Sequence, residues 1–268
     1  MLRLLFFLLL TATLHAQTAR VYRLDANGQR ANLLRTETYE NGRLLKKVSY
    51  LPDGRKHKGY TYEYDARGNV TEEIKTNLDG HEWDHIRQYE YDDQDRRIGQ
   101  LHGNNLTGKW GSKRFLFDGN DHLETIKHYR KNGRHYKDTR FQNQYDERGR
   151  LAERSGTDVD LNGQPLITHN TLRFTYPTER TVRETQIDST GTTVLTLTTS
   201  RDEAGRVLAE TIETTGSAAV KTTFSYHPDG RIRRREEFLG RRRTKTVNYT
   251  YRTDGLPLRR SGEEVYVW

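Results

Sequence analysis

A short unit that recurs along nearly the whole chain constrains its fold more than any other feature. The clearest copy, Asn143–Leu151, reads NQYDERGRL. Tyr62–Val70 (YEYDARGNV), Phe115–Leu123 (FLFDGNDHL) and Phe224–Ile232 (FSYHPDGRI) are further copies. Each has two aromatic residues at alternate positions, a turn built on Asp and Gly, and an aliphatic residue that starts the next segment. The chain is therefore a repeat protein, in which each unit must bury its apolar face against its neighbours.

The copies keep a regular period. Eight of them begin at Tyr62, Tyr89, Phe115, Asn143, Phe174, Thr199, Phe224 and Tyr249. They start 25 to 31 residues apart, and a second series of turns, from Leu78-Asp79-Gly80 to Phe238-Leu239-Gly240, lies between them. A turn thus arrives about every 13 residues, so each unit consists of two strands and two turns.

The segments between turns alternate in polarity with a period of two. Tyr60, Tyr62 and Tyr64 are separated by Thr61 and Glu63. This alternation, rich in aromatic and β-branched residues, places the apolar side chains on one face of a β-strand. The composition agrees with an ordered structure that has a small core. The 16 Tyr and only 5 Pro favour order, and the low apolar share of 32% limits the core.

The turns have a physical basis. An Asp or Asn side chain can bind its own backbone two residues further on, and Gly adopts the positive φ that tight hairpin turns need. Asp95 and Asp121 occupy the Gly position in two copies, and Asp tolerates a left-handed conformation better than most residues. The residues predicted to have this structural role are Tyr64, Asp65, Gly68, Tyr91, Asp92, Phe117, Asp118, Tyr145, Asp146, Gly149, Gly205, Tyr226, Gly230, Tyr251 and Gly255.

These patterns predict an all-β fold, a repetitive antiparallel meander of hairpins with a unit of about 26 residues. No helical pattern is long enough to cover the sheet. We therefore expect a single layer that hides its aromatic face by curling into an open spiral or incomplete barrel. Residues 17–268 form one repeat domain in this interpretation, and Glu263–Trp268 is its terminal capping strand.

The first 16 residues have the plan of a secretory signal. Arg3 carries the charge, Leu4–Leu10 is apolar, and Ala16 offers a cleavage site. The apolar run is far shorter than the roughly 20 residues that span a bilayer, and we expect no transmembrane segment after signal removal. The chain has no Cys, which excludes disulfides, cysteine metal sites and a lipidated Cys. We expect a secreted, periplasmic or cell-surface protein.

At Tyr145–Leu151 and Tyr64–Gly68 the chain resembles the YD-repeat (Rhs-repeat) family, whose unit is Y-D-x-x-G-R-[LIV]. The resemblance implies an extracellular or cell-surface bacterial protein with a coiling β-sheet, and carbohydrate binding is commonly attributed to such repeats. Large members form a hollow shell around a toxin. This chain is much shorter and lacks a toxin-like C-terminal segment and the D-P-x-G-type self-cleavage motif. Its N-terminal unit Tyr39–Leu44 also resembles the Y-x-N-G-x-L hairpins of surface and antitoxin-like proteins.

One stretch matches a catalytic motif. His81, Glu82 and His85 fit H-E-x-x-H, in which a helix brings two His onto one zinc ion and Glu acts as the general base. Here the motif runs into a predicted strand, where the two His would lie about 13 Å apart. We therefore interpret the match as chance and expect no metal, no other cofactor and no enzymatic activity. The alternative is a secreted zinc metallohydrolase.

Positive charge is concentrated in one hairpin. Between Arg231 and Lys245, seven Arg and one Lys stand against two Glu. We expect Arg233–Arg235 to stand beside Arg241–Arg243. The cationic residues are Arg231, Arg233, Arg234, Arg235, Arg241, Arg242, Arg243 and Lys245. They are a candidate site for acidic glycans, phosphates of lipopolysaccharide or nucleic acid. The favoured interpretation is a solvated face that protects a sheet edge, and export argues against nucleic acid.

The aromatic residues allow one further interpretation. Trp83, Trp110 and Trp268 offer large faces on which sugars can stack, although Tyr rows are needed first for the core. The sequence thus predicts an exported, non-enzymatic repeat protein that acts as a binding or structural module for cell-surface or extracellular material, with polysaccharide as the expected partner. Another surface protein is a second possible partner. A partner-binding or neutralising protein of a toxin system is the remaining alternative.

Overall fold

The protein is described by a computed structural model that covers residues 16–25, 27, 29–78, 84–260 and 264–267. Every element in these ranges is a β-strand. The strands are β1 (Gln17–Leu24), β2 (Arg30–Glu40), β3 (Arg43–Tyr50), β4 (Lys56–Tyr64), β5 (Val70–Asn77), β6 (Asp84–Tyr91), β7 (Arg97–Asn104), β8 (Gly108–Phe117), β9 (Leu123–Arg130), β10 (His135–Tyr145), β11 (Leu151–Val159), β12 (Pro165–Thr168), β13 (Thr171–Thr178), β14 (Thr181–Ile187), β15 (Thr193–Arg201), β16 (Val207–Thr214), β17 (Val220–Tyr226), β18 (Ile232–Leu239), β19 (Arg242–Tyr251), β20 (Pro257–Arg260) and β21 (Glu264–Val267).

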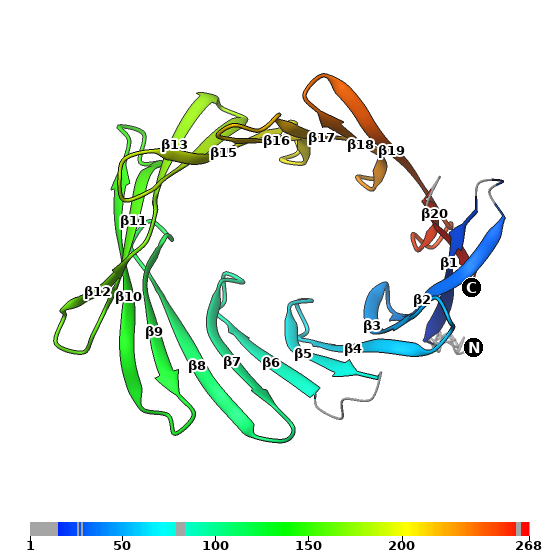
Figure 1. The fold of residues 1–268 in the computed structure, drawn as a ribbon, viewed down its shortest axis with the longest axis horizontal. Coiled ribbons are helices and arrows are strands. Elements are labelled where there is room, and N and C mark those ends of the chain that lie inside the picture. The colour runs from blue at the N-terminus through cyan, green and yellow to red at the C-terminus, as the bar shows by residue number, and fades with distance from the viewer. Residues whose placement is uncertain (1–15, 26, 28, 79–83, 261–263, 268) are drawn as a thin grey trace, which may run out of the picture.

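The strands form one antiparallel sheet in which chain neighbours are sheet neighbours almost throughout. Figure 1 shows the sheet curling into a ring, with the blue N-terminal and red C-terminal strands side by side. β1 pairs with β2 on one side and with β21 on the other. The predicted all-β meander and its curl are confirmed. No helix in the described part of the chain is long and apolar enough to cross a membrane.

The curled sheet is an incomplete barrel. At two joints, neighbouring strands are connected by only a few paired residues. At the first joint β11 pairs partly with the short β12 and then, over two described residue pairs, with β13. At the second joint two described pairs link β20 to β21. Most other ladders are longer, with seven described pairs between β4 and β5. The direct β11–β13 and β20–β21 ladders are therefore held by fewer backbone pairs than most of the sheet.

The predicted Asp and Gly residues lie in the turns that follow β4, β6, β8, β10, β15, β17 and β19, and the predicted aromatic residues are the last residues of the strands before those turns. At the first of them, Asp65 Oδ1 accepts the backbone N–H groups of Gly68 at 2.8 Å and Asn69 at 2.9 Å. Asp95 and Asp121 have φ of 61° and 63°, so the predicted left-handed Asp residues are confirmed. Local side-chain chemistry accounts for these turns.

The repeat tyrosines connect one unit to the preceding one. The Tyr226 hydroxyl donates to the carbonyl of Val207, the residue that restarts the previous unit, at 2.6 Å. The guanidinium of Arg206 lies over the same ring, 4.8 Å from its centroid. We call this pair of contacts the tyrosine clamp. The hydroxyl contact recurs from Tyr64 to Leu44, Tyr91 to Val70, Tyr176 to Leu151 and Tyr251 to Ile232.

The clamp can be tested with Tyr226→Phe, which removes the hydroxyl but keeps the ring. We expect the free energy of unfolding to fall by about 0.5–1.5 kcal/mol, because the half-buried carbonyl of Val207 loses its donor. Urea denaturation measures the loss. Tyr60→Phe is the matched control, since no hydrogen bond is described for the Tyr60 hydroxyl. Equal losses in the two variants would show that the clamp hydroxyl contributes nothing.

The most buried part of the molecule lies where the two ends of the sheet meet. Ala19 and Val21 of β1 are fully buried, and Tyr266 of β21 is almost so. Arg35 of β2 reaches across and binds Glu264 of β21 through both guanidinium nitrogens, at 2.5 and 2.7 Å. Arg35 also donates to the Tyr266 hydroxyl at 2.9 Å. We call this region, with the Glu37 partner described below, the seam.

Candidate binding pocket on the inner face of the sheet

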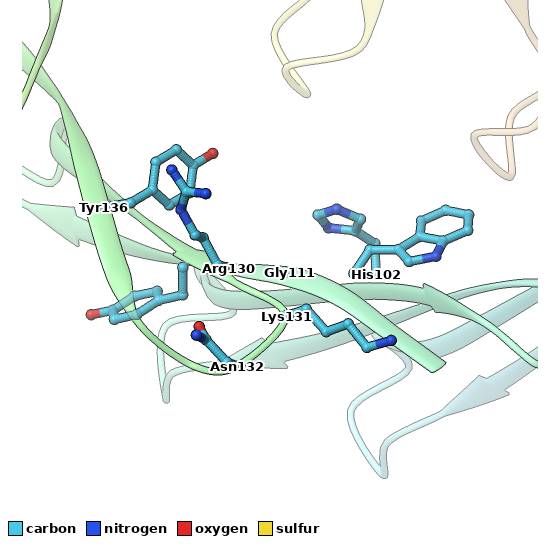
Figure 2. A pocket seen from close by; sticks show the side chains of 8 residues that line it. His102, Gly111, Arg130, Lys131, Asn132 and Tyr136 are labelled. Atoms are coloured by element: carbon cyan, nitrogen blue, oxygen red, sulfur yellow. The ribbon is translucent and has the colours of Figure 1, made fainter. Parts of the chain in front are cut away.

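A pocket of about 870 Å³ opens on the sheet between β7 and β10. His102 of β7 and Trp110 and Gly111 of β8 line one part. The other part is lined by Tyr129, Arg130, Lys131, Asn132 and Tyr136, which come from β9, β10 and the turn between them. Figure 2 shows His102, Arg130 and Tyr136 projecting from the sheet to the side on which loops of the opposite wall lie. The pocket therefore faces the inside of the ring.

Strand register explains how three of these residues meet. His102 pairs with Gly111, and Gly111 pairs with Arg130 on the next strand. Residues directly opposite each other in an antiparallel sheet share a face. A side chain at Gly111 would not fit, since its Cβ would lie 2.7 Å from the carbonyl oxygen of Tyr129. Glycine thus forms the floor of the pocket.

The two exposed aromatic side chains of the pocket both lie at β-bulges. In the β7–β8 ladder, His102 pairs with Gly111 and Gly103 with Lys109, so Trp110 is the extra residue. In the β9–β10 ladder the extra residue is Tyr136. A bulge redirects the side chain of its extra residue. The equivalent positions of the β2–β3 and β14–β15 hairpins hold Leu45 and Val194.

Local contacts fix the orientation of both rings. The Trp110 indole N–H donates to Thr107 Oγ1 at 2.5 Å, and the rings of His85 and His102 meet the indole edge-on at 5.4 and 6.1 Å. The Arg130 guanidinium lies over the Tyr136 ring, 5.0 Å from its centroid. Trp110 and Tyr136 remain 36% and 37% exposed. The pocket therefore offers a ligand two aromatic rings whose orientation is fixed by neighbouring side chains.

Positive charge and burial act together on the histidines near the pocket. Burial, Lys113 and Arg87 lower the pKa of His102. Burial, Lys113 and Lys137 lower the pKa of His128 to about 4, against the opposing effect of Asp158. The pKa of His85 is also lowered, by burial and then by Lys75 and Arg87. These imidazoles are neutral at pH 7.

The arginine hairpin differs from the prediction. Arg234 and Arg235 pair with Asn248 and Val247, whereas Arg242 and Arg243 pair with Leu239 and Phe238. The predicted pairing of Arg233–Arg235 with Arg241–Arg243 was therefore wrong, although Arg234 and Arg243 both reach Glu236. The reason is hairpin symmetry: the turn lies between Leu239 and Arg242, so residues before Phe238 meet residues beyond Arg243.

Several of these cations have acidic partners. Arg234 and Arg243 both bind Glu236, at 2.6 and 3.0 Å, and Arg235 binds Glu237 at 2.8 Å. Arg231 binds Asp229 at 2.5 Å and lies over the Tyr251 ring. Arg233, Arg241 and Arg242 are exposed and Lys245 is half-buried. The hairpin as an anion site stays a prediction.

The histidine motif is described in part. His81 and Glu82 lie outside the described residues. His85 lies on β6 and pairs with Lys75 and Asn104, so the predicted strand at this residue is present. Among the described residues no group of three or more His, Asp or Glu side chains is placed to hold a metal ion.

Sequence reasoning selected Trp110 for sugar stacking but missed its neighbours His102, Arg130 and Tyr136. Arg130 and Tyr136 flank a turn that ordinary hairpin chemistry explains, so neither stood out. Alignment of the hairpins would have provided a signal. Trp110 lies two residues after the turn glycine Gly108 and Tyr136 three residues after Gly133, and the two turns are consecutive members of the second series of turns.

The unit and the fold define a β-sheet repeat protein. Residues 32–78 match the model of the RHS repeat family. The chain thus carries an RHS repeat, and the resemblance inferred from the Tyr-Asp units is confirmed. No curated protein matches the sequence.

Several solved structures resemble the chain at low identity. One is a porin-like protein from Bacteroides uniformis, with 11% identity over 93% of this chain and 95% of that chain and a TM-score of 0.37. Another is a chain of the TcdB2-TccC3-Cdc42 structure, with 12% identity over 92% of this chain and a TM-score of 0.30. This chain covers 15% of that one. With TM-scores below 0.5, these resemblances say nothing further about shape or function.

Proposed function

We propose that this protein binds glycan chains and that the pocket around Trp110 and Tyr136 is the binding site. The observation that carries the proposal is the use of two bulges, in the β7–β8 and β9–β10 hairpins on either side of the β8–β9 turn, to present aromatic rings to one pocket. A sugar ring has an apolar face that packs on an aromatic ring and a rim of hydroxyls that need hydrogen-bond partners. Apolar surfaces with a few placed polar groups are typical of ligand sites.

A binding role suits the side chains better than a catalytic one. His85 and His102 are the titratable groups with described ring contacts to the indole, and both meet Trp110 in a T-shaped arrangement. They support the stacking surface, whereas a general base must be aimed at a reacting atom. We therefore infer a non-enzymatic module. Export by the segment 1–16 would bring it into contact with polysaccharide of the cell surface or of the surroundings.

The proposal predicts that Trp110→Ala weakens glycan binding at least tenfold, because the larger of the two stacking surfaces is lost. A glycan array selects the ligand, and titration calorimetry measures its Kd. Trp110→Phe, which keeps a smaller ring, should lose less.

Leu116→Ala is the matched control, since Leu116 lies on the same strand, is 41% exposed and pairs with Thr125 on the opposite face. Binding to no glycan on the array, or equal binding by the Ala variants of Trp110 and Leu116, would disprove the proposal.

A further inference from the structure

We infer that the glycan bound in this pocket is acidic, and that Arg130 and Lys131 hold its carboxylate or sulfate group beside a sugar stacked on Trp110. The inference rests on the proposed function and adds a ligand class to it. It also places the anion site on β8 and β9 and the turn that follows, far along the chain from the arginine hairpin.

The first step is the charge of the lining. The described residues that line the pocket include the cations Arg130 and Lys131 and the neutral His102, and none of the described lining residues is Asp or Glu. A neutral sugar needs no such excess of positive charge. An anionic group placed there would meet positive charge, with no carboxylate among the described lining residues to repel it.

The second step concerns the cations that surround the lining on the same face. Lys113 pairs with Gln100 on one side and with His128 on the other, and no ion pair is described for it. Arg87, opposite His102, is matched by Glu73 at 3.2 Å. Lys113 therefore adds to the uncompensated positive charge, whereas Arg87 adds little.

The third step is geometry. The Arg130 guanidinium lies over the Tyr136 ring, with Cζ 5.0 Å from the centroid, and Arg130 is exposed. A guanidinium over a ring still has N–H groups at its own edge, where a carboxylate or a sulfate can be bound through two parallel hydrogen bonds. Lys131 donates one hydrogen bond to the carbonyl of Thr107 at 2.6 Å, and an ammonium has three N–H groups to donate. Both cations can therefore bind a ligand without giving up their present contacts.

Protonation provides an independent consequence. His102 is faced by Arg87 from β6, by Lys113 and Trp110 from β8, and through Arg87 by Glu73 from β5. A bound anion would offset the two cations, so His102 would gain a proton more easily. Ligand binding is then linked to proton uptake, and the affinity for an acidic glycan rises as the pH falls from 7 towards 5.

The experiment compares matched probes by titration calorimetry with the full chain. Oligogalacturonate and its fully methyl-esterified form test the carboxylate, while dextran sulfate and dextran test the sulfate. At least one charged probe should bind tenfold or more tightly than its neutral counterpart, and more tightly at pH 5.5 than at pH 7. Arg130→Gln should remove this preference and leave the neutral probe within about twofold.

Arg140→Gln is the matched control, because Arg140 pairs with Thr125 and Thr157 on the outer face. Neutral binding that equals charged binding and depends on Trp110 would overturn the acidic ligand but leave the proposed function standing. Absence of binding to all four probes, or equally tight binding of single-stranded DNA, would overturn the inference. In that case the glycan array alone decides whether the proposed function holds.

Discussion

Replacing Arg35 by Met should reduce the free energy of unfolding by about 3–5 kcal/mol, the range found when one partner of a buried ion pair is removed. The Arg35 side chain is 11% exposed and binds Glu37 and Glu264, which are 7% and 15% exposed. Glu37 also accepts a hydrogen bond from the Tyr39 hydroxyl at 2.6 Å. Without Arg35 the buried Glu37 and the half-buried Glu264 lose this cation, and the joint between β20 and β21 has two described backbone pairs to compensate.

Urea denaturation measures this loss, and Arg55→Met is its matched control. Arg55 pairs with Asp53 on the surface, with 73% and 51% exposure, so its removal should cost about 0–1 kcal/mol. If Arg35→Met does not fold, adding Glu37→Gln and Glu264→Gln should restore folding, because the carboxylate charges that Arg35 balanced are then gone. Equal losses for the Arg35 and Arg55 variants would contradict this role of the seam.

Asp158→Ala should cost about 3 kcal/mol by the same logic at the other joint. The buried carboxylate accepts hydrogen bonds from Thr139 at 2.6 Å and His169 at 2.9 Å, and it pairs with Lys137. His169 lies between β12 and β13, and its backbone N–H donates to Gly156. The variant leaves Lys137 without its counter-charge. It also removes a partner of His169 at the joint where β11 has only short ladders to β12 and β13. Glu203→Ala, an exposed carboxylate paired with Arg180, is the control and should change stability little.

The pH dependence separates two groups in this region. Hydrogen bonds from Lys137, Thr139 and His169 hold the pKa of Asp158 well below its usual range, against the effect of burial. Its stabilisation is complete above the unfolded value of about 3.9 and is lost as the pH falls further. The pKa of His128 is lowered to about 4. The contribution of the neutral imidazole to stability is therefore complete above about pH 6.5 and is lost between pH 6.5 and 4.

Urea denaturation at several pH values distinguishes the two groups. Asp158→Ala should flatten the loss of stability below pH 4, and His128→Gln should flatten the loss between pH 6.5 and 4. An unchanged slope in either window would show that the corresponding group is not the one that titrates there.

The sequence predicted the elements of the fold well because their causes are local. Alternation around Tyr62 defines a strand from a few residues, and the turn at Asp65 is built from side-chain contacts with residues up to Asn69. The left-handed Asp95 and Asp121 follow from the same local chemistry. Curling was predictable because a single layer has no other way to cover one face.

The candidate site could not be predicted because it depends on register. Trp110 lines the pocket because one extra residue in β8 redirects it, and a bulge changes which face every later residue takes. The position of the turn between Leu239 and Arg242 likewise decides which residues the arginines of the 231–245 hairpin pair with. The contact of Arg35 with Glu264 joins residues 229 positions apart, and nothing in the local sequence of either residue indicates it.

The tyrosine clamp has a consequence for how such a molecule can change in size. The hydroxyl of Tyr226 reaches back one unit, to Val207, and that of Tyr251 reaches Ile232 in the same way. Each of these units therefore supplies its own hydrogen bond to the unit before it. A duplication of one unit would lengthen the circumference by two strands, or about 9–10 Å, and would need no new chemistry at the seam. The diameter of the ring is thus adjustable in steps over evolution, while the seam chemistry at Arg35 can stay unchanged.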